Sequence, residues 1–197
     1  MTSRENLNAR VLPTLNLALL AAFLIVLWMA GGASRADVLG QAVTRIVAWA
    51  IGITLILYSF PEWRQIKPIA LLLFVATTLV AIQLVPLPPA WWLEMPGRQL
   101  LADAATATGQ EQPWRPLSIS PGATINALSS LIVPAVTLLL LAGLKWTSQW
   151  RVLALLLGII VASSLVGLLQ FSGARFGNPL INDVPGSVSG FFANRNH

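Results

Sequence analysis

Apolar blocks long enough to cross a membrane as helices dominate this sequence. Five of them follow one another along the chain, at residues 12–30, 42–60, 68–85, 123–144 and 152–171. Each is about 18 to 22 residues long, which suits a hydrocarbon core of about 30 Å. Because lipid offers no hydrogen-bond partners, such unalternated runs satisfy their backbones as helices rather than as barrel strands. The sequence therefore predicts an all-α, multi-pass membrane protein, with a single transmembrane domain over residues 1–197.

The composition agrees with a bilayer environment and excludes several functions. Only 10% of the residues are charged, against roughly a quarter in soluble domains. The net charge of +5 comes from single Lys and Arg residues scattered between apolar blocks, with no basic stripe, so we expect no nucleic-acid partner. The chain has no cysteine, which excludes disulfides and Cys-ligated metals. Apart from Arg45 near one end, the blocks carry no charge, which disfavours an ion-coupled transporter.

The distribution of basic residues predicts the orientation. They are densest in the N-terminal head and in two short turns, at 61–67 and 145–151, which favours a cytoplasmic N-terminus. The first block exceeds the usual length of a signal-peptide core, so we interpret it as a retained signal anchor. Pro68 suits the first turn of the third helix. This topology exposes the loop 86–122 and the stretch 172–197 on the outer face, which in a Gram-negative cell would be the periplasm.

The loop 86–122 is polar, proline-rich and flanked by apolar blocks. Within it, residues 91–107 favour an amphipathic helix at the membrane surface, and its tryptophans, like those near the other block ends, are typical of an aromatic belt. Arg98 and Arg115 have two interpretations. They are ordinary solvated loop charges, or they line a cleft for an anionic headgroup, because a guanidinium fork suits phosphate oxygens.

The densest polar cluster lies at residues 194–197, after Phe191, Phe192 and Ala193. It comprises Asn194, Arg195, Asn196 and His197. These side chains offer a cation, two amides and an imidazole for a diphosphate; the alternative is an interfacial turn whose arginine meets lipid phosphates. His197 has no second ligand at metal-binding spacing, so we predict no metal site.

Three segments resemble one known family. They are Gln83-Leu-Val-Pro-Leu-Pro-Pro-Ala-Trp-Trp92, Arg115-Pro-Leu-Ser-Ile-Ser-Pro-Gly-Ala-Thr124 and Ser189-Gly-Phe-Phe-Ala-Asn-Arg-Asn-His197. In order and spacing they are similar to the N-terminal half of bacterial O-antigen ligases and O-antigen polymerase-like proteins. The resemblance implies a bacterial inner-membrane glycosyltransferase of ten to twelve helices, which moves polysaccharide from undecaprenyl diphosphate to a lipid or glycan acceptor at the periplasmic face.

The resemblance also implies what the site contains. Arginines neutralise the diphosphate leaving group while a base activates the acceptor hydroxyl, with no nucleotide sugar and no metal cofactor. By position, Asn194, Arg195, Asn196 and His197 are candidate diphosphate-proximal residues, with Arg98 and Arg115 as further candidates. The family's large periplasmic loop lies in its second half, so we expect this chain to be a fragment, and its catalytic residues are not assigned.

A second hypothesis from the sequence is a non-enzymatic membrane component that assists assembly or export of an envelope polysaccharide. Its partners are the lipid bilayer and other proteins of envelope-polysaccharide assembly. The two hypotheses differ in what they require of Arg195, which matters for glycan transfer in the first and not in the second.

Overall fold

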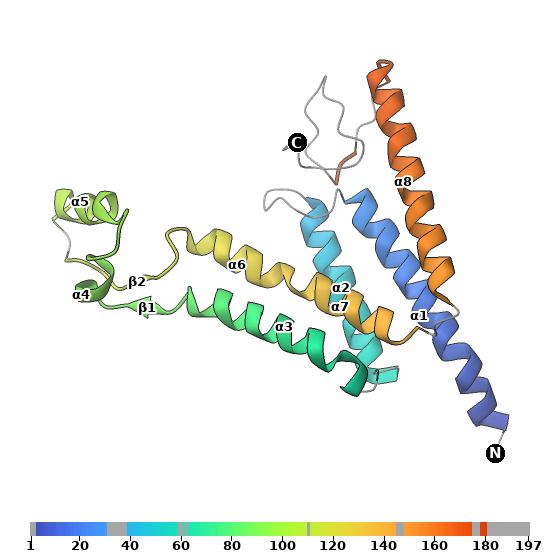
Figure 1. Cartoon of the computed structure of the whole chain (residues 1–197). Helices are drawn as coiled ribbons and strands as arrows, with labels where there is room; N and C mark the ends of the chain where they lie inside the picture. Colours follow the sequence, from blue (N-terminus) through green and yellow to red (C-terminus); the bar gives the residue numbers. More distant parts are fainter. Residues whose placement is uncertain are drawn as a thin grey trace. The chain divides into compact units, whose positions relative to one another are not determined.

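A computed structural model describes residues 3–30, 39–58, 61, 63–109, 111–144, 148–174 and 178–180, with the backbone alone at 3–14, 63 and 65. The chain is mostly helical (Figure 1). Its elements are α1 (Ser3–Met29), α2 (Leu39–Tyr58), α3 (Trp63–Ile82), β1 (Pro86–Leu87), α4 (Pro89–Trp92), α5 (Gln99–Ala107), β2 (Arg115–Pro116), α6 (Pro121–Ser130), α7 (Ile132–Ala142) and α8 (Gln149–Phe171).

Three helical stretches are long and apolar enough to cross a membrane. They are Leu39–Tyr58, Pro121–Ala142 and Gln149–Phe171, and they make the chain a membrane protein by length and composition. Two shorter apolar helices, Leu15–Met29 and Ile66–Ile82, coincide with the first and third predicted blocks. The helical fold is thus confirmed, whereas five crossings and their orientation stay predictions.

The third helix differs from its predicted start. α3 begins at Trp63, so Pro68 lies inside the helix and not in its first turn. A proline there removes one helical hydrogen bond, because it has no N–H to offer the carbonyl of Arg64. The predicted turn at 61–67 is correspondingly shorter, since residues from Trp63 onward are helical.

The fourth predicted helix is interrupted. α6 ends at Ser130 and α7 begins at Ile132, with the N–H of Leu131 bonded to the Leu128 carbonyl in a tighter turn. Pro134 explains this position, because it lacks the N–H that would bond to the carbonyl four residues earlier. The break also falls at the boundary between the two compact units into which the chain divides, residues 1–69 with 132–197 and residues 70–131.

In the first unit, α1, α2 and α7 pack together around an apolar core. It consists of Leu20, Phe23, Ala48, Ile51, Leu55, Val136 and Leu140. We call these three helices the helix cluster. The buried residues of α2 recur every three or four positions and therefore form one face. A Cβ at Gly52 would lie 3.3 Å from Cγ2 of Val136, so this glycine permits the close approach of α2 and α7.

Polar contacts supplement this packing. Asn16 of α1 is buried and donates from Nδ2 to the Gly143 carbonyl at 3.2 Å. The indole N–H of Trp28 donates to Oγ of Ser163 in α8 at 2.5 Å. In lipid, such bonds between helices replace solvation that the bilayer does not supply.

The second unit contains a folded loop between α3 and α6, residues 83–120, which we call the connector. The predicted amphipathic helix at 91–107 is wrong as one element, because the chain forms α4 and α5 with a turn between them. Gly97 has a φ of 78°, a conformation that side-chain-bearing residues rarely adopt, and it lies in that turn. The sequence also gave no indication of the short antiparallel ladder of β1 and β2, which pairs Pro86 with Pro116 and Leu87 with Arg115.

Candidate functional site

The ladder closes the connector at its base. Next to it, the N–H of Ser118 donates to the Gln83 carbonyl at 2.8 Å, so the chain leaves α3 and returns toward α6 at one place. Proline favours extended backbone in the residue before it and tolerates the edge of a sheet, which suits Pro86 and Pro116. Ser118 Oγ also lies 2.6 Å from Oγ1 of the buried Thr124, and this contact holds the segment after β2 against the first turn of α6.

Trp92 lies at the centre of the connector. Its side chain is 0% exposed, and its indole N–H donates to the Pro113 carbonyl at 2.9 Å. The adjacent Trp91 is 66% exposed. The interpretation of these tryptophans as one aromatic belt is therefore wrong for Trp92, which forms the core of the connector.

Arg98 is a buried cation that holds the connector together. It is 3% exposed, and its Nη2 donates to the carbonyls of Pro116, at 3.3 Å, and of Leu117. Its own carbonyl accepts the N–H groups of Leu101 and Ala102 at the start of α5. Bonds from a charged donor to fixed carbonyls offset the desolvation of the guanidinium. This arrangement makes Arg98 a structural residue of the connector, and a role in binding diphosphate stays a prediction.

Arg115 is only partly engaged. Its guanidinium carbon lies 5.3 Å from the centroid of the Trp92 ring, a cation–π contact that holds the side chain over the indole. Its Nε is buried and has no hydrogen-bond partner among the described residues. An arginine has five N–H donors and cannot lose its charge, so this side chain retains capacity for an anionic oxygen.

Gln112 ties the segment before β2 to α5. Its Nε2 donates to the Ala102 carbonyl at 3.1 Å and to Oγ1 of Thr106 at 3.3 Å. Its Oε1 is buried without a donor from the described residues. Gln112 was not predicted as a site residue, because no pattern in a polar loop distinguishes it from a solvated glutamine.

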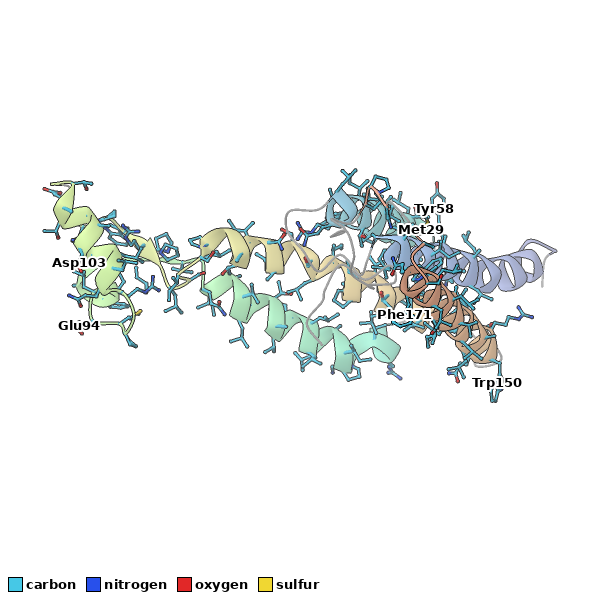
Figure 2. All side chains as sticks on the ribbon, turned by 90° about the horizontal axis from the view of Figure 1, so that it is seen from above. Met29, Tyr58, Glu94, Asp103, Trp150 and Phe171 are labelled. Carbon is cyan, nitrogen blue, oxygen red and sulfur yellow. The ribbon has the colours of Figure 1, made fainter. Side chains whose placement is uncertain are left out.

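The acidic residues of the connector lie on its outside. Figure 2 shows Glu94 and Asp103 at the end of the connector that is remote from α3 and α6, and both are exposed. Within the described part of the chain, no three His, Cys, Asp or Glu residues are grouped as metal ligands would be.

The predicted site residues separate into two sets. Arg98 and Arg115 belong to the same folded connector, where Arg98 bonds to the carbonyl of Pro116, the residue next to Arg115. The other four, Asn194, Arg195, Asn196 and His197, lie outside the described residues.

Comparisons with known proteins add no assignment. No family model, no curated protein and no solved structure matches this chain. The likeness to O-antigen ligases and polymerases therefore rests on the three sequence segments quoted above and stays a prediction.

Proposed function

We propose that this chain belongs to a bacterial inner-membrane protein of the O-antigen ligase or polymerase type, which transfers polysaccharide from undecaprenyl diphosphate at the periplasmic face. It crosses the membrane five times with a cytoplasmic N-terminus, and the connector and residues 172–197 share the outer face. Two features support the proposal: the three segments that resemble the family, and apolar helices at all five predicted blocks. The donor is a lipid-linked glycan, and the acceptor is a lipid or a growing glycan.

The observation that most supports the proposal is that the Arg115 guanidinium is held in place but has an unpartnered donor among the described residues. A transferase of this type must stabilise negative charge as the diphosphate leaves, and a fixed cation does so without reorganising during the reaction. The cation–π contact with the buried Trp92 holds the Arg115 guanidinium in place, and the buried Nε has no hydrogen-bond partner among the described residues. Arg98 contributes indirectly by holding the carbonyls on either side of the β2 end in place.

The test is Arg115→Gln in the full reading frame from which the chain comes, expressed in cells that make the lipid-linked glycan. We expect glycan transfer to fall by roughly 100-fold, the usual effect of removing one donor to a developing anion. Arg64→Gln, on the predicted cytoplasmic side, is the matched control and leaves transfer unchanged. Protein level and hydrogen exchange at the Ser118 amide report whether the connector remains folded.

One observation favours the non-enzymatic assembly or export component instead. Arg98 donates from Nη2 to carbonyls of the connector, and Gln112 donates from its side-chain amide to another. Both side chains thus stabilise the connector itself, as expected of a structural component. Under this alternative, Arg115→Gln leaves polysaccharide assembly unchanged while the connector stays folded. That result would remove the transferase proposal, because no other described cation of the connector has comparable freedom.

A further inference from the structure

Several apolar side chains of the connector point away from its core. Trp91 and Trp114 are each 66% exposed, although they adjoin the buried Trp92 and the half-buried Arg115. Leu93, Leu117 and Ile119 are also exposed. A water-facing loop with an internal core has no need of two exposed tryptophans. Tryptophan is the residue that is enriched where a protein surface meets lipid headgroups.

The connector is joined at both ends to apolar helices, the shorter apolar part of α3 (Ile66–Ile82) before it and the span-length stretch Pro121–Ala142 after it. The bond from Ser118 to the Gln83 carbonyl keeps its base at the ends of both helices. Val85, Ile119 and Ile125 are exposed on either side of that base. The apolar surface of the helices therefore continues onto the connector, and lipid that covers the helices would lie beside it.

Whether Trp114 reaches the bilayer depends on its height above Ser118 at the base of the connector. The headgroup layer on each side of the hydrocarbon core is about 5–7 Å thick. Trp114 lies four positions before Ser118, and four steps of extended chain would span about 13 Å. If the ladder stood along the membrane normal, Trp114 would project beyond the headgroups into water.

We propose that the connector leans onto the bilayer, so that Trp91 and Trp114 lie at headgroup level while its acidic outer end stays in water. Leaning brings Trp114 closer to the membrane surface and buries two large indole rings, whose N–H groups have no partner among the described residues and can donate to a lipid ester or phosphate. Glu94 and Asp103 lie at the end remote from the helices (Figure 2), where repulsion by anionic lipid is weakest. This anchoring is independent of glycan transfer.

Nitroxide labelling tests the proposal, and the absence of cysteine makes it direct, because a single introduced cysteine is labelled uniquely. The full chain is reconstituted in vesicles of equal parts phosphatidylethanolamine and phosphatidylglycerol. The positions are Trp91→Cys and Trp114→Cys, with Phe74→Cys on the exposed surface of α3 as the lipid control and Asp103→Cys as the water control. The readout is the ratio of collisions with oxygen, which concentrates in lipid, to collisions with a water-soluble nickel chelate.

We expect labels at 91 and 114 to give ratios several-fold above that at 103 and below that at 74. Leu93→Cys and Leu117→Cys keep both tryptophans and should also exceed the water control, which guards against misfolding of the tryptophan variants. Ratios at 91 and 114 equal to that at 103 would mean that the connector stands off the bilayer, and the proposal would be wrong. Suppressed collisions with both reagents would also overturn it, because a protein surface would then cover the tryptophans.

Discussion

The helix cluster and the connector are stabilised by opposite means. The cluster of α1, α2 and α7 buries seven apolar side chains and few polar ones. The connector buries one large apolar side chain, Trp92, and surrounds it with hydrogen bonds from Trp92, Arg98 and Gln112 to backbone carbonyls. Apolar packing thus stabilises the helix cluster, whereas hydrogen bonds around one buried indole stabilise the connector.

The difference follows from the solvent. Between membrane helices the hydrophobic effect contributes little, because lipid tails are as apolar as leucine, so shape and close approach hold the cluster together. Outside the hydrocarbon, burying an indole gains the full hydrophobic stabilisation, and a loop must satisfy its backbone carbonyls without a long ladder. Substitutions should therefore affect the two regions in different ways.

Trp92→Ala should have the largest effect. Removing a fully buried tryptophan costs about 3–5 kcal/mol, and here it also removes the bond to the Pro113 carbonyl and the ring under Arg115. We expect the Ser118 amide to lose its protection from hydrogen exchange while amides of α2 and α7 keep theirs. Trp91→Ala is the neighbouring control and should change the opening free energy by no more than about 0.5 kcal/mol. Equal losses in both variants would contradict a connector built around Trp92.

Arg98→Met should come next. Methionine keeps much of the buried volume but cannot donate to the Pro116 and Leu117 carbonyls, and a bond from a charged donor contributes about 1.5–3 kcal/mol. Exchange at the Ser118 amide measures the loss. Gln99→Met, at the exposed first residue of α5, should leave exchange unchanged. If Arg98→Met also leaves exchange at the Ser118 amide unchanged, the buried guanidinium is not what holds the segment at Pro116 and Leu117 in place.

Gly52→Val tests the cluster. The new side chain would push α2 away from Val136, and overpacking of this kind costs about 1–3 kcal/mol. The thermal unfolding midpoint in detergent is the measurement. Gly158→Val is the matched control, since nothing lies within 4 Å of a Cβ at that helical glycine. Similar midpoints for the two variants would argue against close packing of α2 on α7.

Asn16→Leu should have the smallest effect. It removes the bond to the Gly143 carbonyl, and hydrogen bonds between membrane helices contribute about 0.6 kcal/mol on average. Thr77→Val is the comparison, because among the described residues the Thr77 hydroxyl donates to the Leu73 carbonyl of its own helix and to no other helix. A loss of stability for Asn16→Leu as large as that for Gly52→Val would show that polar contacts, and not close approach, dominate the cluster.

The sequence predicted the helices well and the connector poorly. Apolar length alone locates α2 and α8 to within a few residues, because the thickness of the bilayer fixes the length of such runs. The break at Leu131 was not predicted, although Pro134 carries the signal. Nothing in the sequence separates Trp91 from Trp92, since adjacent identical residues have the same hydropathy and only tertiary contacts decide which one is buried. Arg98 had a solvated and an anion-binding interpretation, whereas its structural role depends on carbonyls 18 and 19 residues away.

The central claim is that the connector is a folded module with Trp92 inside it. Its most direct test is hydrogen exchange of the indole N–H groups in full chain labelled with ¹⁵N-tryptophan. The account predicts that the Trp92 indole, bonded to the Pro113 carbonyl, exchanges far more slowly than those of Trp91 and Trp114. Equal exchange at all three positions would contradict it.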